Sequence, residues 1–286
     1  AGGSAAESAQ IAAQSAFNTE MSNVLAGLRS EASQMAAEGK ELYETTGSAG
    51  FTGGSCWVNE LSVTSTYMTE EGLLSVVAEN YTYYGGAHPN SVSRTWSFDL
   101  TTGEFLTLDA LSSEEGDING DSLQTSIYQN IVSQIDSQGL SEAYFDDYDS
   151  YLSDFPAFAT FYFTATGMTV AFDTYIIAPY AAGPQVFDVP YSVFYSALNE
   201  RAKTLLEVPQ EQIVLSDFDT AATLWSWLFI TTPPTEDTPD EMEINGYTYY
   251  QADIPGVSTL AELRALMYRY FDKALADRWL EETERY

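Results

Sequence analysis

Short alternating stretches separated by tight turns constrain this chain more than any other feature. The first, Trp57–Thr69, alternates with Leu61, Val63 and Tyr67 on one side. Glycine-containing turns separate it from the strands that follow, which are Leu73–Tyr84, Val92–Leu100 and Glu104–Leu108. Connections of a few residues join neighbouring strands only when the strands run antiparallel. The sequence therefore predicts an antiparallel β-meander over residues 57–108.

Helical periodicity lies on both sides of this meander. Between Ser4 and Tyr43, apolar residues recur mostly at steps of three or four and form one stripe, consisting of Ile11, Phe17, Met21, Val24, Leu25, Leu28, Ala32 and Met35. Further helices are predicted over Asp121–Gln138, Ser192–Leu206, Asp219–Phe229 and Thr259–Leu275. Additional strands are predicted over Phe158–Thr164, Met168–Ile177, Val186–Val189 and Tyr247–Gln251. We therefore expect an α+β fold, in which an antiparallel β-meander packs with helices.

A change in composition near Val208-Pro209 indicates a domain boundary, which we place at about residue 212. Residues 1–212 form the first predicted domain, and residues 213–286 form a smaller helical or α+β domain. The segment Thr231–Asp240 is rich in proline and predicts a linker or mobile loop. Across it, we expect the helix at Thr259–Leu275 to pack its apolar face on the helix that carries Trp225–Phe229.

The charge balance restricts the partners that this chain can bind. It has 42 acidic and 10 basic residues, so the formal net charge is 10 − 42 = −32. Such a chain repels phosphate backbones and anionic membrane surfaces, which excludes nucleic acid as a partner. It attracts cationic proteins, most strongly at low salt.

Cys56 is the only cysteine and His88 the only histidine. The chain can therefore form no internal disulfide, thiolate metal site or two-histidine metal site, and we predict no metal and no cofactor. These two residues could in principle form a nucleophile–base pair, since a thiolate nucleophile needs an adjacent base. Cys56 follows Gly53-Gly54-Ser55 without a helix start, which favours a small buried residue beside Trp57. His88 precedes Pro89, which favours a turn whose imidazole bonds to its own domain.

Asp117, Asn119 and Asp121 have the spacing with which a calcium loop begins. Tyr128 stands where that loop needs a bidentate acid, so an EF-hand fails and only a weaker calcium site stays open. The favoured alternative is an Asn-Gly turn followed by a helix capped by Asp121, with Gln124 completing a capping box. A pair of carboxylates could serve a hydrolase, but in a chain with 42 acidic residues every short stretch offers such pairs. The pattern therefore does not identify an active site, and no catalytic residue is predicted.

Aromatic and acidic residues are interspersed in one segment just after the middle of the chain. Its candidate binding residues are Tyr144, Phe145, Asp146, Asp147, Tyr148, Asp149, Tyr151 and Asp154. Aromatic anchors among carboxylates suit a cationic protein partner. A half-buried helix edge would give the same pattern, and the sequence does not separate the two interpretations.

Three blocks of sequence resemble a known family. They are Ser75–Pro89, which ends in Tyr84, Gly85, Gly86, Ala87, His88 and Pro89; Phe98–Gly103; and Ile177–Ser192, with Pro179, Tyr180, Gly183 and Pro184. In this order they resemble the extracytoplasmic domain of RsiV-type anti-sigma factors, shared with the N-terminal region of PdaC-type peptidoglycan deacetylases, over residues 15–200. The resemblance implies an α+β domain outside the membrane of a Gram-positive bacterium. In the anti-sigma branch this domain binds lysozyme, and the resemblance carries over no catalytic residue.

The tail is similar to a different family. Ala222–Trp227, Ile244–Tyr250 and Ser258–Tyr270 resemble the first part of an IseA-type inhibitor of cell-wall endopeptidases, which implies an incomplete domain of that kind. Both resemblances indicate the cell envelope. The N-terminal sequence looks like a mature or trimmed chain, and it leaves open a membrane anchor upstream of residue 1.

We therefore predict an extracytoplasmic, non-enzymatic binding protein, secreted or anchored on the outer face of a Gram-positive cell. It would recognise lysozyme or another cell-wall hydrolase, as a sensor or an inhibitor. The first alternative is a peptidoglycan or carbohydrate-binding module that uses Trp and Tyr platforms. The second is a cryptic cell-wall hydrolase.

Overall fold

The structure is a computed structural model and describes residues 5–47, 58–83, 88–139, 143–235, 241–244 and 246–283. It confirms an α+β fold with antiparallel sheets packed against helices. The chain forms two compact units. The first unit contains Ala1–Thr107, Val132–Asp188 and Leu205–Glu207, and the second contains Leu108–Ile131, Val189–Thr204 and Val208–Tyr286. The boundary near residue 212 stays a prediction.

The predicted meander is the main sheet of the first unit. Its strands are β1 (Val58–Met68), β2 (Leu73–Tyr83), β3 (Asn90–Asp99) and β4 (Glu104–Phe105). They lie in the order β1-β2-β3-β4, and each neighbouring pair is antiparallel. The short turns dictate this order because each strand must pair with the one before it.

One expectation about β1 is wrong. Leu61 pairs with Asn80 and Val63 with Ala78, but the register then shifts so that Tyr67 pairs with Ser75. Directly opposed residues share a face, so Tyr67 lies on the other face from Leu61 and Val63. The cause is a β-bulge between Val63 and Ser65, whose extra residue reverses the alternation beyond it.

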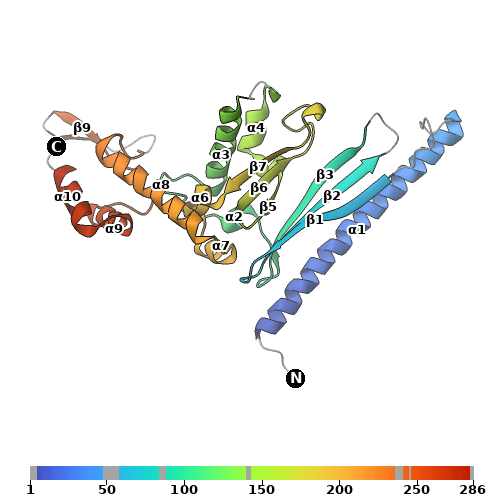
Figure 1. Ribbon diagram of the computed structural model, residues 1–286, viewed down its shortest axis with the longest axis horizontal. Helices are drawn as coiled ribbons and strands as arrows, with labels where there is room; N and C mark the ends of the chain where they lie inside the picture. Colours follow the sequence, from blue (N-terminus) through green and yellow to red (C-terminus); the bar gives the residue numbers. More distant parts are fainter. Residues whose placement is uncertain are drawn as a thin grey trace. The chain divides into compact units, whose positions relative to one another are not determined.

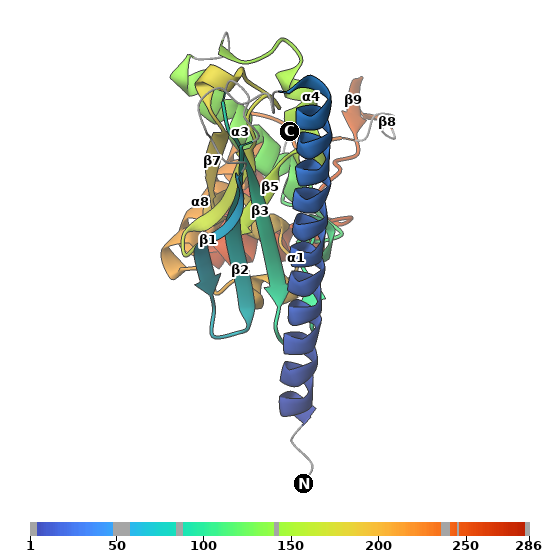
Figure 2. The same cartoon turned by 90° about the vertical axis from the view of Figure 1, so that its right-hand side faces the viewer.

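The long helix α1 (Ala5–Thr46) runs beside this sheet, as Figures 1 and 2 both show. The ring of Phe17 lies 5.9 Å from that of Phe98 on β3, edge to face. Gly103 adopts a φ of +83°, and a Cβ there would lie 3.3 Å from the Cα of Ala13. The predicted apolar stripe is confirmed except at Ile11 and Leu25, which are 62% and 46% exposed.

The first unit also contains a smaller sheet. The strands predicted over Phe158–Thr164 and Met168–Ile177 form an antiparallel hairpin, β5 (Thr160–Phe163) and β6 (Gly167–Phe172). Strand β6 ends five residues earlier than predicted, and β7 (Gln185–Pro190) completes the sheet. Every residue of β6 is buried, as a central strand covered on both faces requires. Two short helices, α4 (Tyr148–Ser153) and α5 (Phe155–Phe158), precede β5.

Helix α3 (Leu123–Gln138) spans the boundary between the units and confirms the predicted helix there. Ile127, Ile131 and Ile135 are fully or almost fully buried. The expected cap is wrong, because the hydroxyl of Ser122, not Asp121, accepts the N–H of Thr125. The Asp121 side chain instead accepts a hydrogen bond from the amide of Gln129.

The helix predicted over Ser192–Leu206 is interrupted. The structure has α6 (Tyr191–Phe194), the 3-10 turn η3 (Tyr195–Ala197) and α7 (Glu200–Leu205) instead. Asn199 causes the break, because its side-chain oxygen accepts the N–H of Ala202 and so starts α7. Its side-chain nitrogen donates to the carbonyls of Ala110, in α2 (Leu108–Leu111), and Ser112.

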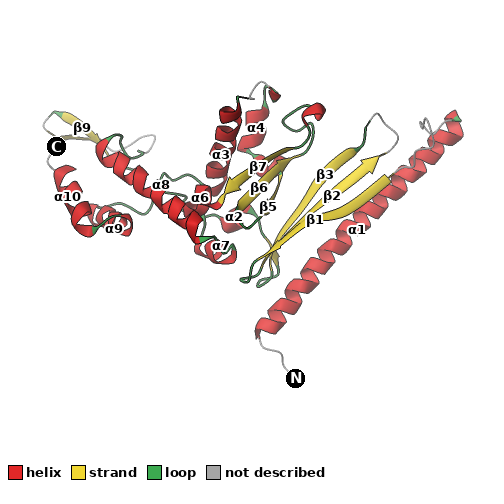
Figure 3. Cartoon of the chain, in the orientation of Figure 1, coloured by secondary structure: helices red, strands yellow, loops and turns green. Residues whose placement is uncertain are grey.

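The rest of the second unit is mostly helical (Figure 3). The helix predicted over Thr259–Leu275 is interrupted and forms two helices, α9 (Leu260–Tyr270) and α10 (Lys273–Thr283). The backbone is extended at Phe271, and Asp272 then starts α10 by accepting the N–H groups of Ala274 and Leu275. The expected packing on α8 (Gln210–Phe229) is confirmed by a core of Leu224, Met267 and Ala276.

Strand β9 (Tyr247–Tyr250) confirms the predicted strand, and it pairs with β8 (Glu241–Ile244), which the sequence analysis missed. Residues 236–240 of the proline-rich segment lie outside the described residues. Of the helices that the structure describes, none combines the length and apolar composition needed to cross a bilayer.

Candidate functional site

The segment predicted to bind a partner surrounds α4 in the first unit. The hydroxyl of Tyr144 donates to Gln185, 3.0 Å away, and the N–H of Phe145 donates to the carbonyl of Ile177. The rings of Tyr144 and Tyr148 lie 5.3 Å apart. Burial raises the pKa of Tyr144, and Tyr148 adds to this effect. These contacts fix the aromatic half of the segment.

The carboxylates of this segment point to solvent. Asp146, Asp147, Asp149 and Asp154 are all exposed. Asp147 and Asp154 precede α4 and α5, yet neither side chain caps its helix. The half-buried ring of Tyr151 packs edge to face on Phe158, at 4.8 Å, and Phe158 is 43% exposed. The structure thus pairs Tyr144 with Tyr148 and Tyr151 with Phe158 within one continuous segment, residues 144–158, whose exposed side we call the α4 surface.

The family-motif block around His88 is described only in part, because Tyr84, Gly85, Gly86 and Ala87 lie outside the described residues. His88 itself lies just before β3, with its Nδ1 2.9 Å from the carbonyl oxygen of Pro89. Its ring stacks on Tyr180 at 3.8 Å, and the Tyr180 hydroxyl donates to the same carbonyl. The prediction that His88 bonds within its own domain at a strand end is confirmed.

These contacts join two of the motif blocks. Pro179 precedes the 3-10 turn η2 (Tyr180–Ala182), and Gly183 ends it with a φ of +71° before Pro184. The turn presents the Tyr180 ring to His88, so these residues have an architectural role. Cys56 lies outside the described residues, so the Cys56–His88 pair stays untested.

Tyr175 extends this contact into an exposed aromatic cluster that the sequence analysis missed. Its ring lies 5.5 Å from Tyr180 and 6.5 Å from His88, and it is 57% exposed. Its φ is +70°, a strained conformation for a residue with a Cβ. The backbone thus holds a large ring outward at a cost in free energy.

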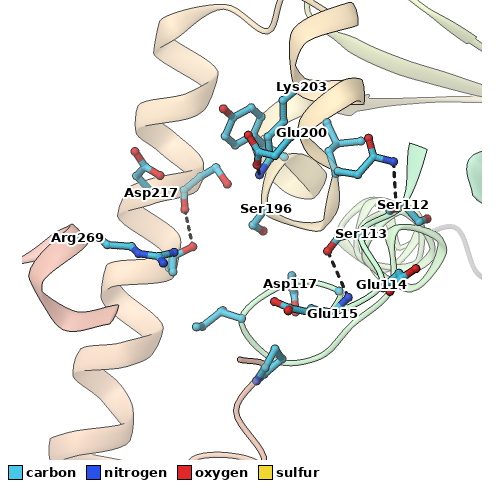
Figure 4. A pocket seen from close by; sticks show the side chains of 18 of the residues that line it. Ser112, Ser113, Glu114, Glu115, Asp117, Ser196, Glu200, Lys203, Asp217 and Arg269 are labelled. Atoms are coloured by element: carbon cyan, nitrogen blue, oxygen red, sulfur yellow. Dashed lines mark hydrogen bonds and ion pairs between the residues drawn. The ribbon is translucent and has the colours of Figure 1, made fainter. Parts of the chain in front are cut away.

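The second unit contains a cavity of about 670 Å³ (Figure 4). Its walls come from the loop after α2, the segment around η3 and α7, one face of α8 and the end of α9. Five lining residues are acidic, namely Glu114, Glu115, Asp117, Glu200 and Asp217. Two are basic, Lys203 and Arg269. The acidic loop Ser112–Asp117 was the only local sequence signal for this site.

Tyrosines and one lysine shape the charge in this cavity. The Lys203 ammonium lies 2.8 Å from a Glu200 oxygen and 5.3 Å above the ring of Tyr195. Burial raises the pKa of Tyr195, with smaller contributions from Glu200 and then Asp217. Burial also raises the pKa of Tyr270, followed by Asp217. Asp217 thus contributes to the raised pKa of both tyrosines.

Asp117 has a structural task in the same cavity. Its Oδ1 accepts the N–H groups of Asn119, at 2.7 Å, and Asp121, at 3.0 Å, and so holds the predicted Asn-Gly turn. Burial raises its pKa more than these bonds lower it. Within the described residues, no three His, Cys, Asp or Glu side chains are grouped as metal ligands.

Two family models match separate parts of the chain. Residues 4–91 match the family described as Deacetylase PdaC, and residues 117–192 match the family described as Protein of unknown function (DUF3298). A comparison with curated proteins found no match. Each of these two parts of the chain is thus similar to one family, and each match covers less than half of the 286 residues.

Similar solved structures belong to the DUF3298 family. One, from Bacteroides fragilis, has 19% sequence identity and a TM-score of 0.40, over 66% of this chain and 70% of that protein. Another, from Pseudomonas aeruginosa, has 16% identity and a TM-score of 0.37, over 51% of this chain and 64% of that protein.

Proposed function

We propose that this chain is a non-enzymatic binding protein that acts outside the cytoplasm and captures a cationic protein. The partner would be a lysozyme or another cell-wall hydrolase, with the chain as its sensor or inhibitor. The α4 surface carries this proposal, because it places exposed carboxylates around half-buried rings. The resemblance of the motif blocks to RsiV-type anti-sigma factors supports the choice of partner.

The carboxylates of the α4 surface would act mainly on the association rate, and its aromatic residues mainly on the dissociation rate. Exposed carboxylates steer a cationic protein over long distances, and salt weakens this effect beyond a Debye length of about 8 Å. Buried aromatic anchors supply most of the contact energy once the complex has formed. The association rate should therefore fall as salt rises, while the dissociation rate changes less.

The experiment is a surface titration of the immobilised chain with lysozyme at two salt concentrations, with cytochrome c as an equally basic control. The test variant replaces Asp146, Asp147 and Asp154 by Asn. It should slow association by about tenfold at low salt. Tyr148→Ala should instead accelerate dissociation by about tenfold at both salt concentrations.

The matched control replaces Glu31, Glu41 and Glu243 by Gln, which removes the same charge from exposed positions elsewhere. It should have a much smaller effect than the α4 variant. If both variants slow association equally, net charge alone attracts the partner. If lysozyme does not bind, or cytochrome c binds equally well, specific recognition is wrong.

The exposed aromatic cluster favours a second candidate function, a carbohydrate-binding module. Sugar rings stack on exposed aromatic faces, and the strained Tyr175 holds such a face outward beside His88 and Tyr180. Titration with soluble peptidoglycan glycan fragments tests this function. Tyr175→Ala should abolish binding, whereas Tyr247→Ala, at another exposed tyrosine, should not. Equal binding by both variants would exclude the platform.

A further inference from the structure

The cavity of the second unit carries carboxylates on opposite walls. Figure 4 shows Asp217 on α8 at one side and the loop with Glu115 and Asp117 at the other. Among the five lining carboxylates, only Glu200 forms an ion pair with a basic residue of the cavity, Lys203. A ligand with positive charge at two points would therefore meet an opposite charge at each wall.

The cavity already shows how it holds an ammonium group. The Lys203 ammonium lies between the Glu200 carboxylate and the Tyr195 ring, and its side chain is only 23% exposed. A carboxylate and an aromatic face together stabilise a cation. Asp217 on α8 and Tyr270 at the end of α9 also line the cavity and offer a carboxylate and an aromatic ring. A second ammonium group would find the same chemistry there.

Ser216 also lines the cavity beside Asp217 and is only 3% exposed. Its carbonyl accepts from Thr220, whereas its own hydroxyl makes no hydrogen bond to another described residue. This hydroxyl is not one of the fully buried side-chain atoms that lack a partner in the described part of the chain, so it reaches the cavity. It can therefore donate to or accept from a polar group of a ligand.

Arg269 adds a site for an anionic group. It is exposed at the edge of the cavity, and its guanidinium forms no ion pair with a carboxylate of the described residues. The planar guanidinium fork matches a carboxylate through two parallel hydrogen bonds. The lining thus offers two positions for ammonium groups and one for a carboxylate.

We propose that this cavity binds a small basic amino acid, with its ammonium groups at Asp217 and the loop carboxylates and its carboxylate at Arg269. The volume of about 670 Å³ is within the usual range for small-molecule sites, roughly 300–1,000 Å³. The proposal concerns a site in the second unit and is independent of the α4 surface.

The experiment is calorimetric titration of the full chain at physiological salt with three probes. L-Lysine carries all three charged groups, 1,5-diaminopentane lacks the carboxylate, and L-norleucine lacks the side-chain ammonium. Lysine should bind at one site per chain and about fivefold more tightly than either of the others, the effect of one exposed ion pair. Binding of many lysines per chain would instead show a counter-ion atmosphere.

Three variants locate the site. Asp217→Asn should weaken lysine binding about fivefold, whereas Asp219→Asn, on the same helix but outside the cavity lining, should not change it. Arg269→Gln should weaken lysine binding about fivefold and leave 1,5-diaminopentane unaffected. Equal effects of the two aspartate variants, or equal loss of both probes with Arg269→Gln, would overturn the proposal.

Discussion

Gly116→Ala tests whether the loop wall of the cavity is as tight as the structure has it. Gly116 has a φ of +75°, and a Cβ there would lie 2.7 Å from the carbonyl oxygen of Asp121 and 2.9 Å from that of Gly120. Both neighbours are backbone atoms, so neither can rotate away. Gly120 provides the matched control, since its φ is +81° but a Cβ would meet nothing closer than Pro255, at 3.8 Å.

Both variants place a Cβ on a residue with positive φ, but only Gly116→Ala also forces that Cβ against backbone atoms. Alanine at a positive φ costs about 1–2 kcal/mol, offset by roughly 0.4–1 kcal/mol from the stiffer unfolded chain. Gly120→Ala should therefore lower the free energy of unfolding by about 1 kcal/mol or less. Gly116→Ala adds overpacking of about 1–3 kcal/mol, so it should cost about 2–4 kcal/mol.

Amide hydrogen exchange measures this effect where it arises. The N–H groups of Asn119 and Asp121 donate to Asp117, so their protection reports on the loop itself. Gly116→Ala should accelerate their exchange far more than Gly120→Ala does. Equal exchange rates in the two variants would refute the close backbone approach and the loop wall built on it.

Two further predictions concern the first unit. The buried Thr69 hydroxyl donates to the carbonyl of Leu205 and accepts the N–H of Leu73. Thr69→Val should therefore lower the free energy of unfolding, measured by urea denaturation, by about 2–4 kcal/mol, and Thr69→Ser by only about 1 kcal/mol. Equal losses in the two variants would refute this role of the hydroxyl. Burial raises the pKa of Asp173 despite the N–H of Ser93, so the folded state keeps this proton to a higher pH than the unfolded state. The free energy of unfolding should therefore fall as pH rises between the two pKa values, and Asp173→Asn should remove that slope; an NMR midpoint below that of an ordinary aspartate would contradict this.

The sequence predicts much of the fold because period-2 and period-3.6 patterns follow directly from burial. Three of the incorrect predictions have the same kind of cause, namely a local interruption that ends a regular strand or helix pattern. The bulge between Val63 and Ser65 reverses a face, Asn199 starts a new helix by bonding elsewhere, and Phe271 becomes extended before Asp272. The bulge arises in the pairing of β1 with β2, and Asn199 also donates to Ala110 and Ser112, which are contacts that a local pattern does not contain. Asp272 instead caps α10 locally, by accepting the N–H groups of Ala274 and Leu275, so that signal was present in the sequence.

The candidate sites divide in the same way. The α4 surface is contiguous in sequence, so its residues could be named beforehand, although their binding role stays a prediction. The cavity combines Glu115, Asn199, Asp217 and Arg269 from separate segments. Only the fold brings these residues together. In the sequence, the acidic loop looks like the other acidic stretches of the chain, so it does not identify a site by itself.

The passage of the chain back and forth between the two units has a consequence for synthesis on the ribosome. The first unit has all its segments once Glu207 has emerged, but the second still lacks everything from Val208 onward. Tyr191 and Phe194, fully buried on α6 in the finished protein, must wait for α8, against which α6 packs. A chain that stalls before α8 therefore holds all segments of the first unit but presents two aromatic rings of α6 to the surroundings, and exposed apolar surface of this kind favours aggregation.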